Sequence, residues 1–347
     1  MTESLTITRP DDWHVHFRDD AMMRACVPET ARVFGRAIAM PNLTPYVATT
    51  DDAIAYRERL RAARPEGSAF EPMMTCYLTD ATDPDDIERG FREKVFLGLK
   101  LYPAHATTNS AAGVTDLRHI HRVLERAEKI GMPLLMHGEE VDPEIDIFDR
   151  EAVFIDRRLG PLTERFPGLR MTLEHLTTAV AVDFVRAKAP QVGGTITPHH
   201  LELTRTDMLG AGLRPDYYCM PIVKTGRDRK AIRAAATSGE ACYFLGSDSA
   251  PHPLARKLAL PGAAGIFSAP TAMEIYAKVF EEEGALDKLE AFASLNGARH
   301  YGLEPNRDTI TLERRRWTAP ASVAVLGPEE QIPVYRGGEM LAWQVTA

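Results

Sequence analysis

Short apolar segments alternate with amphipathic stretches along most of this chain, and this alternation constrains its fold more than any other feature. It is typical of parallel α/β folds, in which each helix returns the chain to the start of the next strand. The eight expected strands are 13–16, 37–40, 72–77, 96–101, 133–136, 171–174, 193–197 and 243–247. Eight strand-then-helix units predict a closed (β/α)8 barrel, or TIM barrel, in a single domain spanning residues 1–347.

The stretches between these strands carry helix signals, such as apolar residues at helical spacing. We expect helices at 51–63, 115–130, 177–189 and 227–237, the first with Asp51 and Asp52 as candidate caps. An open, doubly wound sheet is the alternative α/β architecture. No glycine-rich nucleotide loop of the GxGxxG or Walker type follows the first expected strand, which disfavours that alternative.

Three segments depart from the repeating pattern. Residues 103–115 form a small-residue loop after the fourth expected strand, and residues 248–271 form a long connection after the eighth. Loops at the carboxyl ends of barrel strands carry the chemistry of such folds, so both are candidate functional loops. The tail from residue 318 contains strand-like runs at 322–326 and 340–345, and we expect these to pack beside 5–8 as a small appended sheet, giving small appended strands at the termini.

Charge and cysteine usage exclude several classes of function. The formal net charge is −8 and no long basic run occurs, so we expect no nucleic-acid partner. No apolar stretch approaches the roughly 20 residues that span a bilayer, and the N-terminus does not resemble a secretory signal. The four cysteines form no CxxC pair. We therefore expect reduced thiols in a cytoplasmic protein without membrane partners.

The first expected strand contains a His-x-His pair, His14 and His16. Side chains two residues apart on a strand point to the same face, so the two imidazoles lie together. Two adjacent imidazoles can ligate one transition metal. The alternative for this pair alone is two histidines held by hydrogen bonds at a strand end.

Further ionisable residues occur where other expected strands end. They are Lys100 in the fourth strand, His137 and His175 at the ends of the fifth and sixth, and Asp248 after the eighth. Each has a structural explanation by itself, such as a buried ion pair for Lys100 or a turn cap for Asp248. Because the carboxyl ends of all strands meet at one barrel mouth, the six residues together predict a metal site. Imidazole and carboxylate ligands without a thiolate suit a catalytic zinc-type site better than a structural one.

Lys100 lies within an otherwise apolar strand, where an ammonium group loses its proton readily. A neutral amine can add carbon dioxide and become a carbamate, which is an anionic oxygen ligand able to bridge two metals. Two metals about 3.5–4 Å apart can hold a bridging hydroxide. Asp248 would then be both a metal ligand and the proton shuttle between that hydroxide and the leaving nitrogen.

Local strings narrow the interpretation further. They are Trp-His-Val-His-Phe-Arg-Asp at 13–19, Met-Pro-Asn-Leu at 40–43, Gly-Leu-Lys-Leu-Tyr-Pro at 98–103, Met-His-Gly-Glu at 136–139, and Gly-Ser-Asp-Ser-Ala-Pro-His at 246–252. With the ligand set, they resemble the dihydroorotase family of the short bacterial and yeast type, within the binuclear amidohydrolase superfamily. The resemblance runs through the whole chain. It implies reversible cyclisation of N-carbamoyl-L-aspartate to L-dihydroorotate with loss of water, the third step of de novo pyrimidine biosynthesis.

The resemblance also implies roles for individual residues. Two Zn²⁺ per subunit are expected, one on His14 and His16 and the other on His137 and His175, with carboxylated Lys100 (N6-carboxylysine) bridging them and Asp248 as ligand and acid/base. Arg18, Asn42 and His252 match binders of the substrate carboxylate, the backbones of Met220 and Ala264 match holders of the ring, and Thr107 and Thr108 match the tip of a flexible loop. The expected partner is a small-molecule substrate, and the expected assembly is a homodimer.

Some positions depart from the family pattern. His105 stands where a small polar residue is usual, Met220 replaces leucine, and residues 256–263 lack the cysteines of some members. His199 and His200 match no ligand, and we expect them to be structural. The main alternative is another cyclic-amide hydrolase of the hydantoinase or allantoinase type. A mononuclear deaminase and a barrel without activity are further alternatives, which the complete ligand set disfavours.

Overall fold

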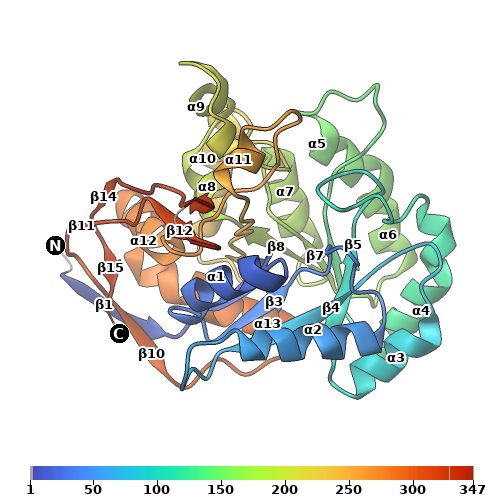
Figure 1. Ribbon diagram of the computed structural model, residues 1–347. Helices are drawn as coiled ribbons and strands as arrows, with labels where there is room; N and C mark the ends of the chain where they lie inside the picture. The colour runs from blue at the N-terminus through green and yellow to red at the C-terminus, as the bar shows by residue number, and fades with distance from the viewer. Residues whose placement is uncertain (1–2, 328, 347) are drawn as a thin grey trace.

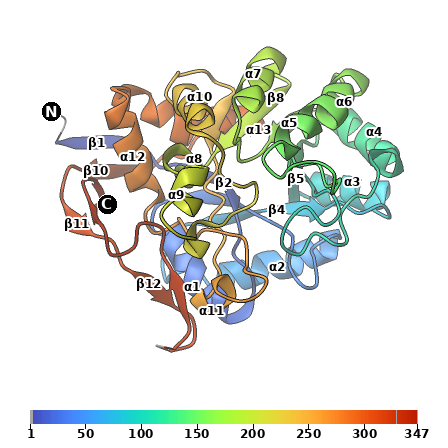
Figure 2. The same cartoon turned by 90° about the horizontal axis from the view of Figure 1, so that it is seen from above.

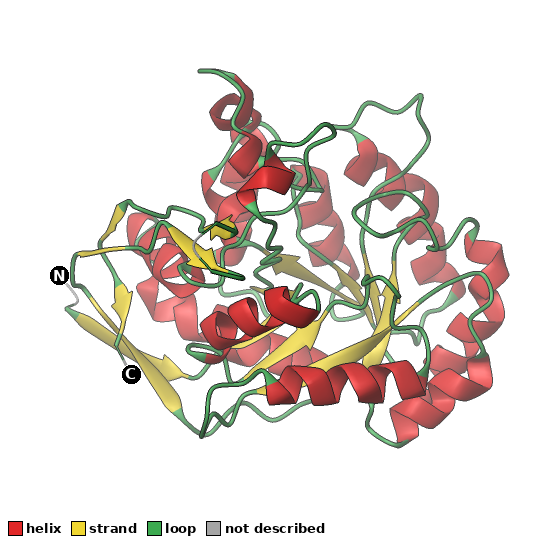
Figure 3. Cartoon of the chain, viewed as in Figure 1, coloured by secondary structure: helices red, strands yellow, loops and turns green. Residues whose placement is uncertain are grey.

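The computed structural model of the chain describes residues 3–327 and 329–346, and its centre is a sheet of eight parallel strands in the order β2 to β9. The strands are β2 (Asp11–Val15), β3 (Arg36–Ala39), β4 (Glu71–Tyr77), β5 (Phe96–Leu101), β6 (Leu134–Met136), β7 (Met171–Leu173), β8 (Val192–Ile196) and β9 (Tyr243–Leu245). All eight predicted strands are confirmed, with ends that differ by no more than two residues. The predicted barrel is therefore the observed architecture (Figures 1 and 3).

The barrel closes just beyond the end of β9. Ser249 forms a parallel bridge with Val15, the Asp248 amide donates to the His14 carbonyl at 2.9 Å, and the His16 amide donates to the Ser249 carbonyl at 3.0 Å. These bonds join the continuation of the last strand to the first strand. Two predicted ligand segments therefore lie side by side at the seam of the barrel.

Helices surround the sheet, as seen from above in Figure 2. They are α1 (Asp20–Ala31), α2 (Thr50–Ala62), α3 (Pro84–Arg92), α4 (His121–Ile130), α5 (Arg150–Phe154), α6 (Gly160–Arg165), α7 (Ala179–Lys188), α8 (Pro198–Glu202), α9 (Arg205–Leu209), α10 (Gly226–Ala236), α11 (Leu254–Lys257), α12 (Ala272–Glu282) and α13 (Asn296–Tyr301). The four predicted helices are present. The stretch 115–130 is divided, because a 3-10 turn at Leu117–Ile120 precedes α4.

The cap of α2 differs from the prediction. Thr49, not Asp51, is the N-cap: its hydroxyl accepts from the Asp52 amide at 3.2 Å, and the Asp52 carboxylate accepts from the Thr49 amide at 3.1 Å. This reciprocal pair satisfies two amides that the first helical turn leaves unpaired. Asp52 therefore takes part in the cap from the third helical position.

Apolar side chains fill the barrel interior on the side of α13. A buried cluster joins Trp13 of β2, Ile38 of β3, Leu135 of β6 and Phe244 of β9 to residues of α13. Trp13 stacks on Tyr301 with ring centres 4.8 Å apart. A Cβ atom at position 297 would lie 2.0 Å from the Trp13 indole nitrogen, so only glycine lets α13 approach this closely.

The terminal strands confirm part of the prediction and correct the rest. β1 (Ser4–Thr8) belongs to a small antiparallel sheet with β10 (Thr309–Glu313) and β15 (Gln344–Val345). A strand is present within 322–326, but its predicted place beside 5–8 is wrong, because β12 (Ser322–Ala324) pairs with β13 (Gln331–Pro333) in a separate hairpin. β11 (Trp317–Thr318) pairs with β14 (Met340–Leu341). β10 occupies the edge of β1 instead, and Ile310 and Leu312 alternate toward the core.

Both described ends of the chain lie near this small sheet, at the left of Figure 1. The prediction of one domain over 1–347 includes residues 1, 2, 328 and 347, which lie outside the described residues. Within the described part of the chain, no helix has both the length and the apolar character needed to cross a membrane. The four cysteines are unpaired, and Cys242 is the least buried of them.

Candidate metal centre

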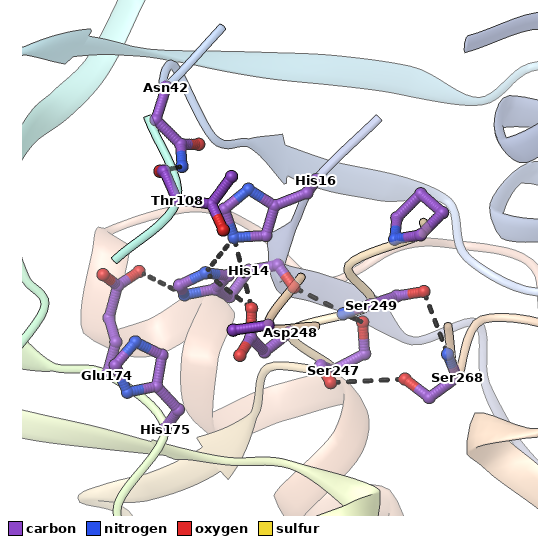
Figure 4. Close-up of polar contacts among 12 residues, drawn as sticks. His14, His16, Asn42, Thr108, Glu174, His175, Ser247, Asp248, Ser249 and Ser268 are labelled. Atoms are coloured by element: carbon purple, nitrogen blue, oxygen red, sulfur yellow. Dashed lines mark hydrogen bonds and ion pairs between the residues drawn. The ribbon is translucent and has the colours of Figure 1, made fainter. Parts of the chain in front are cut away.

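The predicted metal ligands meet at the carboxyl ends of the strands. His14 lies in β2 and Lys100 in β5, while His16, His137, His175 and Asp248 lie within three residues after the ends of β2, β6, β7 and β9. All six residues are buried, none with more than 8% of its surface exposed. Figure 4 shows four of them, His14, His16, His175 and Asp248, around one point of the barrel mouth. The structure thus brings together residues that are up to 234 positions apart in the sequence (14 to 248).

His14, His16 and Asp248 form the tightest group. The two Nε2 atoms are 3.3 Å apart, and each lies 3.2 Å from Oδ1 of Asp248. Burial lowers the pKa of both imidazoles, that of His16 to about 3, so both rings are neutral and carry free lone pairs. Three electron-pair donors within 4.8 Å of one another in a buried site fit a bound cation.

A second group lies on the other side of His14. The ligand atoms of His14, Glu174 and His175 lie within 4.8 Å of one another, and the rings of His137 and His175 are 4.8 Å apart. Nδ1 of His175 is buried and has no hydrogen-bond partner. A buried polar atom without a partner is costly unless a ligand satisfies it, so this group also fits a metal.

Lys100 is wholly buried beside the second group. Its amine contacts the carboxylate of Glu174 and lies 4.6 Å from the centre of the Tyr102 ring. Burial lowers the pKa of Lys100 well below its ordinary value. A neutral amine is the form that adds carbon dioxide, so the environment of Lys100 suits carboxylation.

Two carboxylates that the sequence interpretation did not include contact the ligands. Glu139 Oε2 lies 2.7 Å from Nε2 of His137, and Glu174 Oε1 lies 2.8 Å from Nδ1 of His14. Carboxylates in this position orient metal-bound histidines. Strand alternation directs Glu174 and His175 to opposite faces, but His175 has a φ of +45°, and this bend lets both consecutive side chains reach the site. In the sequence, the Met-His-Gly-Glu string at 136–139 is the feature that could have identified Glu139 as a neighbour of His137.

A buried carboxylate supports the seam beneath the ligands. Asp12 Oδ1 accepts from the His14 amide at 3.1 Å and the Ser247 amide at 2.8 Å, while Oδ2 accepts from the Ser247 hydroxyl at 2.5 Å. These three bonds hold the backbone before Asp248 against the backbone of β2. They explain how Asp248 keeps a φ of +44°, which is unfavourable for a residue with a side chain.

Arg18 and His252 lie together at the edge of this cluster. A terminal nitrogen of Arg18 lies 3.0 Å from Nε2 of His252, and Nε of Arg18 donates to the Pro251 carbonyl at 3.2 Å. The backbone of Arg18 has a φ of +61°, and the Tyr56 hydroxyl donates to its carbonyl at 2.7 Å. The guanidinium therefore has a fixed position and three N–H groups left for a ligand.

The loop 103–115 lies against Asn42. The Asn42 side-chain amide donates to the Thr108 carbonyl at 2.9 Å, and the Asn109 side-chain amide donates to the Asn42 carbonyl at 3.1 Å. Thr107 and Thr108 are half-buried in this arrangement, whereas His105 is exposed. The extra histidine of the loop therefore does not join the ligand cluster.

The remaining predicted residues lie on two neighbouring segments. His252 Nε2 is 2.9 Å from the Ala264 carbonyl, and the Gly265 amide donates to the Tyr218 carbonyl at 2.9 Å, two residues before Met220. The ring nitrogens of His200 contact the Thr197 hydroxyl and the Pro221 carbonyl. These contacts agree with a structural role for His200.

The chain was compared with known proteins. Residues 10–312 match the model of the amidohydrolase family. A dihydroorotase from Parasynechococcus marenigrum (strain WH8102) is 56% identical over 345 residues, which are 99% of each chain. A solved dihydroorotase in complex with 5-fluoroorotic acid from Saccharomyces cerevisiae has a TM-score of 0.92 at 32% identity, over 99% of both chains. An L-hydantoinase from Arthrobacter aurescens, at 15% identity and a TM-score of 0.76 over 99% of this chain and 89% of that one, shares the fold alone.

Proposed function

The chain belongs to the amidohydrolase family, and we propose that it is a dihydroorotase. It catalyses the reversible cyclisation of N-carbamoyl-L-aspartate to L-dihydroorotate with loss of water, the third step of de novo pyrimidine biosynthesis. The observation that carries this proposal is the position of Arg18 and His252 beside the ligand cluster of His14, His16 and Asp248. A cation next to a hydrolytic metal site suits a cyclic amide that bears a carboxylate.

The donor set suits two zinc ions per subunit. His14 and His16 would hold one, His137 and His175 would hold the other, and Asp248 and carboxylated Lys100 would supply further oxygen ligands. When bound, the two ions act as Lewis acids and acidify water near neutral pH. Glu139 and Glu174 orient His137 and His14 through their other ring nitrogens, which leaves the ligating nitrogens directed into the site.

Asp248 carries the proton. Its carboxylate lies 3.2 Å from two imidazoles in a buried site, so few solvent molecules can hydrogen-bond to this carboxylate. During hydrolysis Asp248 takes a proton from the attacking water and delivers it to the ring nitrogen as the C–N bond breaks. During cyclisation the same carboxylate removes the proton from the nitrogen that closes the ring.

The other residues position the substrate. Arg18, Asn42 and His252 bind its carboxylate, and the backbone groups of Met220 and Ala264 hold the amide edges of the ring. Thr107 and Thr108 would form the tip of a flexible loop over the site, and the hydrogen bond from the Asn42 amide to the Thr108 carbonyl supports this role. Exclusion of water strengthens the electrostatic contacts between Arg18 and the substrate.

The protein acts in the cytoplasm as a homodimer. The four unpaired cysteines, three of them buried, support a cytoplasmic enzyme. Size-exclusion chromatography with light scattering measures the oligomeric state.

The deciding experiment measures turnover by purified protein whose zinc content is quantified. We expect consumption of dihydroorotate at about two zinc ions per chain, and no consumption of hydantoin or allantoin in parallel reactions. Turnover of hydantoin or allantoin without dihydroorotate would replace this proposal with the other cyclic-amide hydrolases. Absence of all three activities at full zinc occupancy would exclude both.

A further inference from the structure

A buried lysine lies beside the segments that hold the substrate ring. Lys257, at the end of the short helix α11, has only 3% of its surface exposed. Its ammonium donates to the carbonyls of Tyr218 at 2.8 Å, Ala263 at 3.1 Å and Gly265 at 2.6 Å. A lysine ammonium has three N–H donors, so this one is fully used. The three groups that accept its hydrogen bonds are all backbone carbonyls.

The three carbonyls belong to two segments that are distant in the sequence. Tyr218 lies two residues before Met220, and Ala263 and Gly265 flank Ala264 on both sides. The Gly265 amide also donates to the Tyr218 carbonyl at 2.9 Å, so the segments are joined directly as well. One charged group therefore sets the spacing between the two backbones assigned to the substrate ring.

The local backbone depends on this arrangement. Gly265 has a φ of +146°, and a Cβ atom at this position would lie 2.6 Å from the Ala250 carbonyl and 2.9 Å from the His252 ring. This glycine is thus confined by the chain that carries His252. Such a conformation needs support from its surroundings, and Lys257 provides it through the adjacent carbonyl.

We infer that Lys257 is a positioning residue for the substrate ring: it clamps the segments of Met220 and Ala264 at the spacing that the pyrimidine ring requires. The inference rests on the proposed function, because it uses the ring contacts of those two backbones. Lys257 touches neither the substrate nor the metal ligands. It acts through the backbone that it holds.

Replacement of Lys257 should affect substrate binding, whereas replacement of a lysine with a purely structural role should not. Lys257→Met keeps the apolar stem but leaves the Ala263 and Gly265 carbonyls without the ammonium. Buried carbonyls that lose a charged donor draw water or move, and the movement alters the ring site while the ligand cluster stays intact. We therefore expect weaker substrate binding with nearly unchanged chemistry.

The test compares wild-type protein, Lys257→Met and the control Lys230→Met, in which an exposed lysine of α10 is replaced. We expect the KM for dihydroorotate to rise about tenfold or more in Lys257→Met, with kcat within about threefold of wild type and zinc content unchanged. Lys230→Met should match wild type in all three. An unchanged KM in Lys257→Met would overturn the inference, whereas inactive wild-type protein would overturn the proposed function instead.

Hydrogen exchange of the wild-type protein also tests the clamp, and this measurement does not depend on whether Lys257→Met folds. We expect amides in 262–266 to exchange slowly without ligand, and addition of orotate to change their rates by less than about twofold, because the clamp is formed beforehand. Lys257→Met should exchange faster in this segment. Rapid exchange in ligand-free wild type that becomes slow only with orotate would show that the substrate, not Lys257, orders the segment.

Discussion

Replacement of Arg18 tests the assignment of the substrate carboxylate. The Arg18 guanidinium has five N–H groups, of which Nε is bonded to the Pro251 carbonyl and one terminal N–H is directed at His252. The other three are available for a carboxylate. Arg18→Met removes the charge and the fork, while Arg18→Lys keeps the charge but cannot form a two-point contact.

The size of the effect follows from the position of this side chain. Loss of one partner in a desolvated, hydrogen-bonded charge pair costs about 2–5 kcal/mol. Arg18 is only half-buried, so the lower part of this range applies, about 2–3.5 kcal/mol. At 1.4 kcal/mol for each factor of ten, binding of a carboxylated ring should weaken about 30- to 300-fold in Arg18→Met.

The assay is competitive inhibition by two rings that differ by one carboxylate, orotate and uracil. Arg18→Met should weaken orotate by the factor above and change uracil by less than about threefold. Arg18→Lys should fall between wild type and Arg18→Met for orotate. Residual turnover of dihydroorotate at saturating concentration supplies the reference reaction for each variant.

An equal loss for both rings would refute this reasoning. It would mean that Arg18 shapes the site as a whole, through its bonds to Pro251 and His252, and does not bind a carboxylate. Unchanged zinc content in both variants is the control that separates this result from damage to the metal ligands.

Three further predictions concern other parts of the molecule. Lys100→Ala should retain fewer than two zinc ions per chain after dialysis and lose at least roughly 10³-fold in kcat, because the ligand that we propose to bridge the metals is absent. Full zinc content and full activity would contradict this proposed role of Lys100. Asn42→Ala should raise hydrogen exchange in the loop 105–111, since the Asn42–Thr108 bond is lost. The Glu202 carboxylate accepts hydrogen bonds from Lys278, Tyr335 and Arg336. Burial raises the pKa of Glu202, but the charges of Arg336 and Lys278 outweigh burial and hold this pKa below the ordinary value of 4.5. Glu202→Gln should therefore lower the free energy of unfolding by about 1–3 kcal/mol at pH 7, and this difference should shrink as the pH falls below 4.5, measured by urea denaturation at constant free zinc.

The strands could be predicted from the sequence because each is a short apolar run between polar segments. Their carboxyl ends carry the predicted ligands, so a prediction of the fold is also a prediction of which side chains meet. The contact between His14 and Asp248 follows from barrel closure, because closure brings the segment after the last strand beside the first strand.

The sequence was less informative where the backbone leaves regular geometry. The bend at His175 brings Glu174 into the site, and no periodicity describes two adjacent side chains that face the same way. The clamp by Lys257 likewise depends on three backbone carbonyls, and a residue string does not show where a carbonyl points. The pairing of β12 with β13 was missed for a related reason, because short terminal strands have several partners of similar apolar pattern.

The seam between β2 and the segment after β9 also bears on how the enzyme is made. During synthesis His14 and His16 emerge from the ribosome early, but Asp248 and Ser249 emerge only after more than two-thirds of the chain has been synthesised. Until then the first strand has no neighbour on one side, and the donor set lacks its carboxylate. Incomplete chains therefore cannot form the full site. Assembly of the complete donor set is therefore a late event in biogenesis, possible only once the barrel has closed.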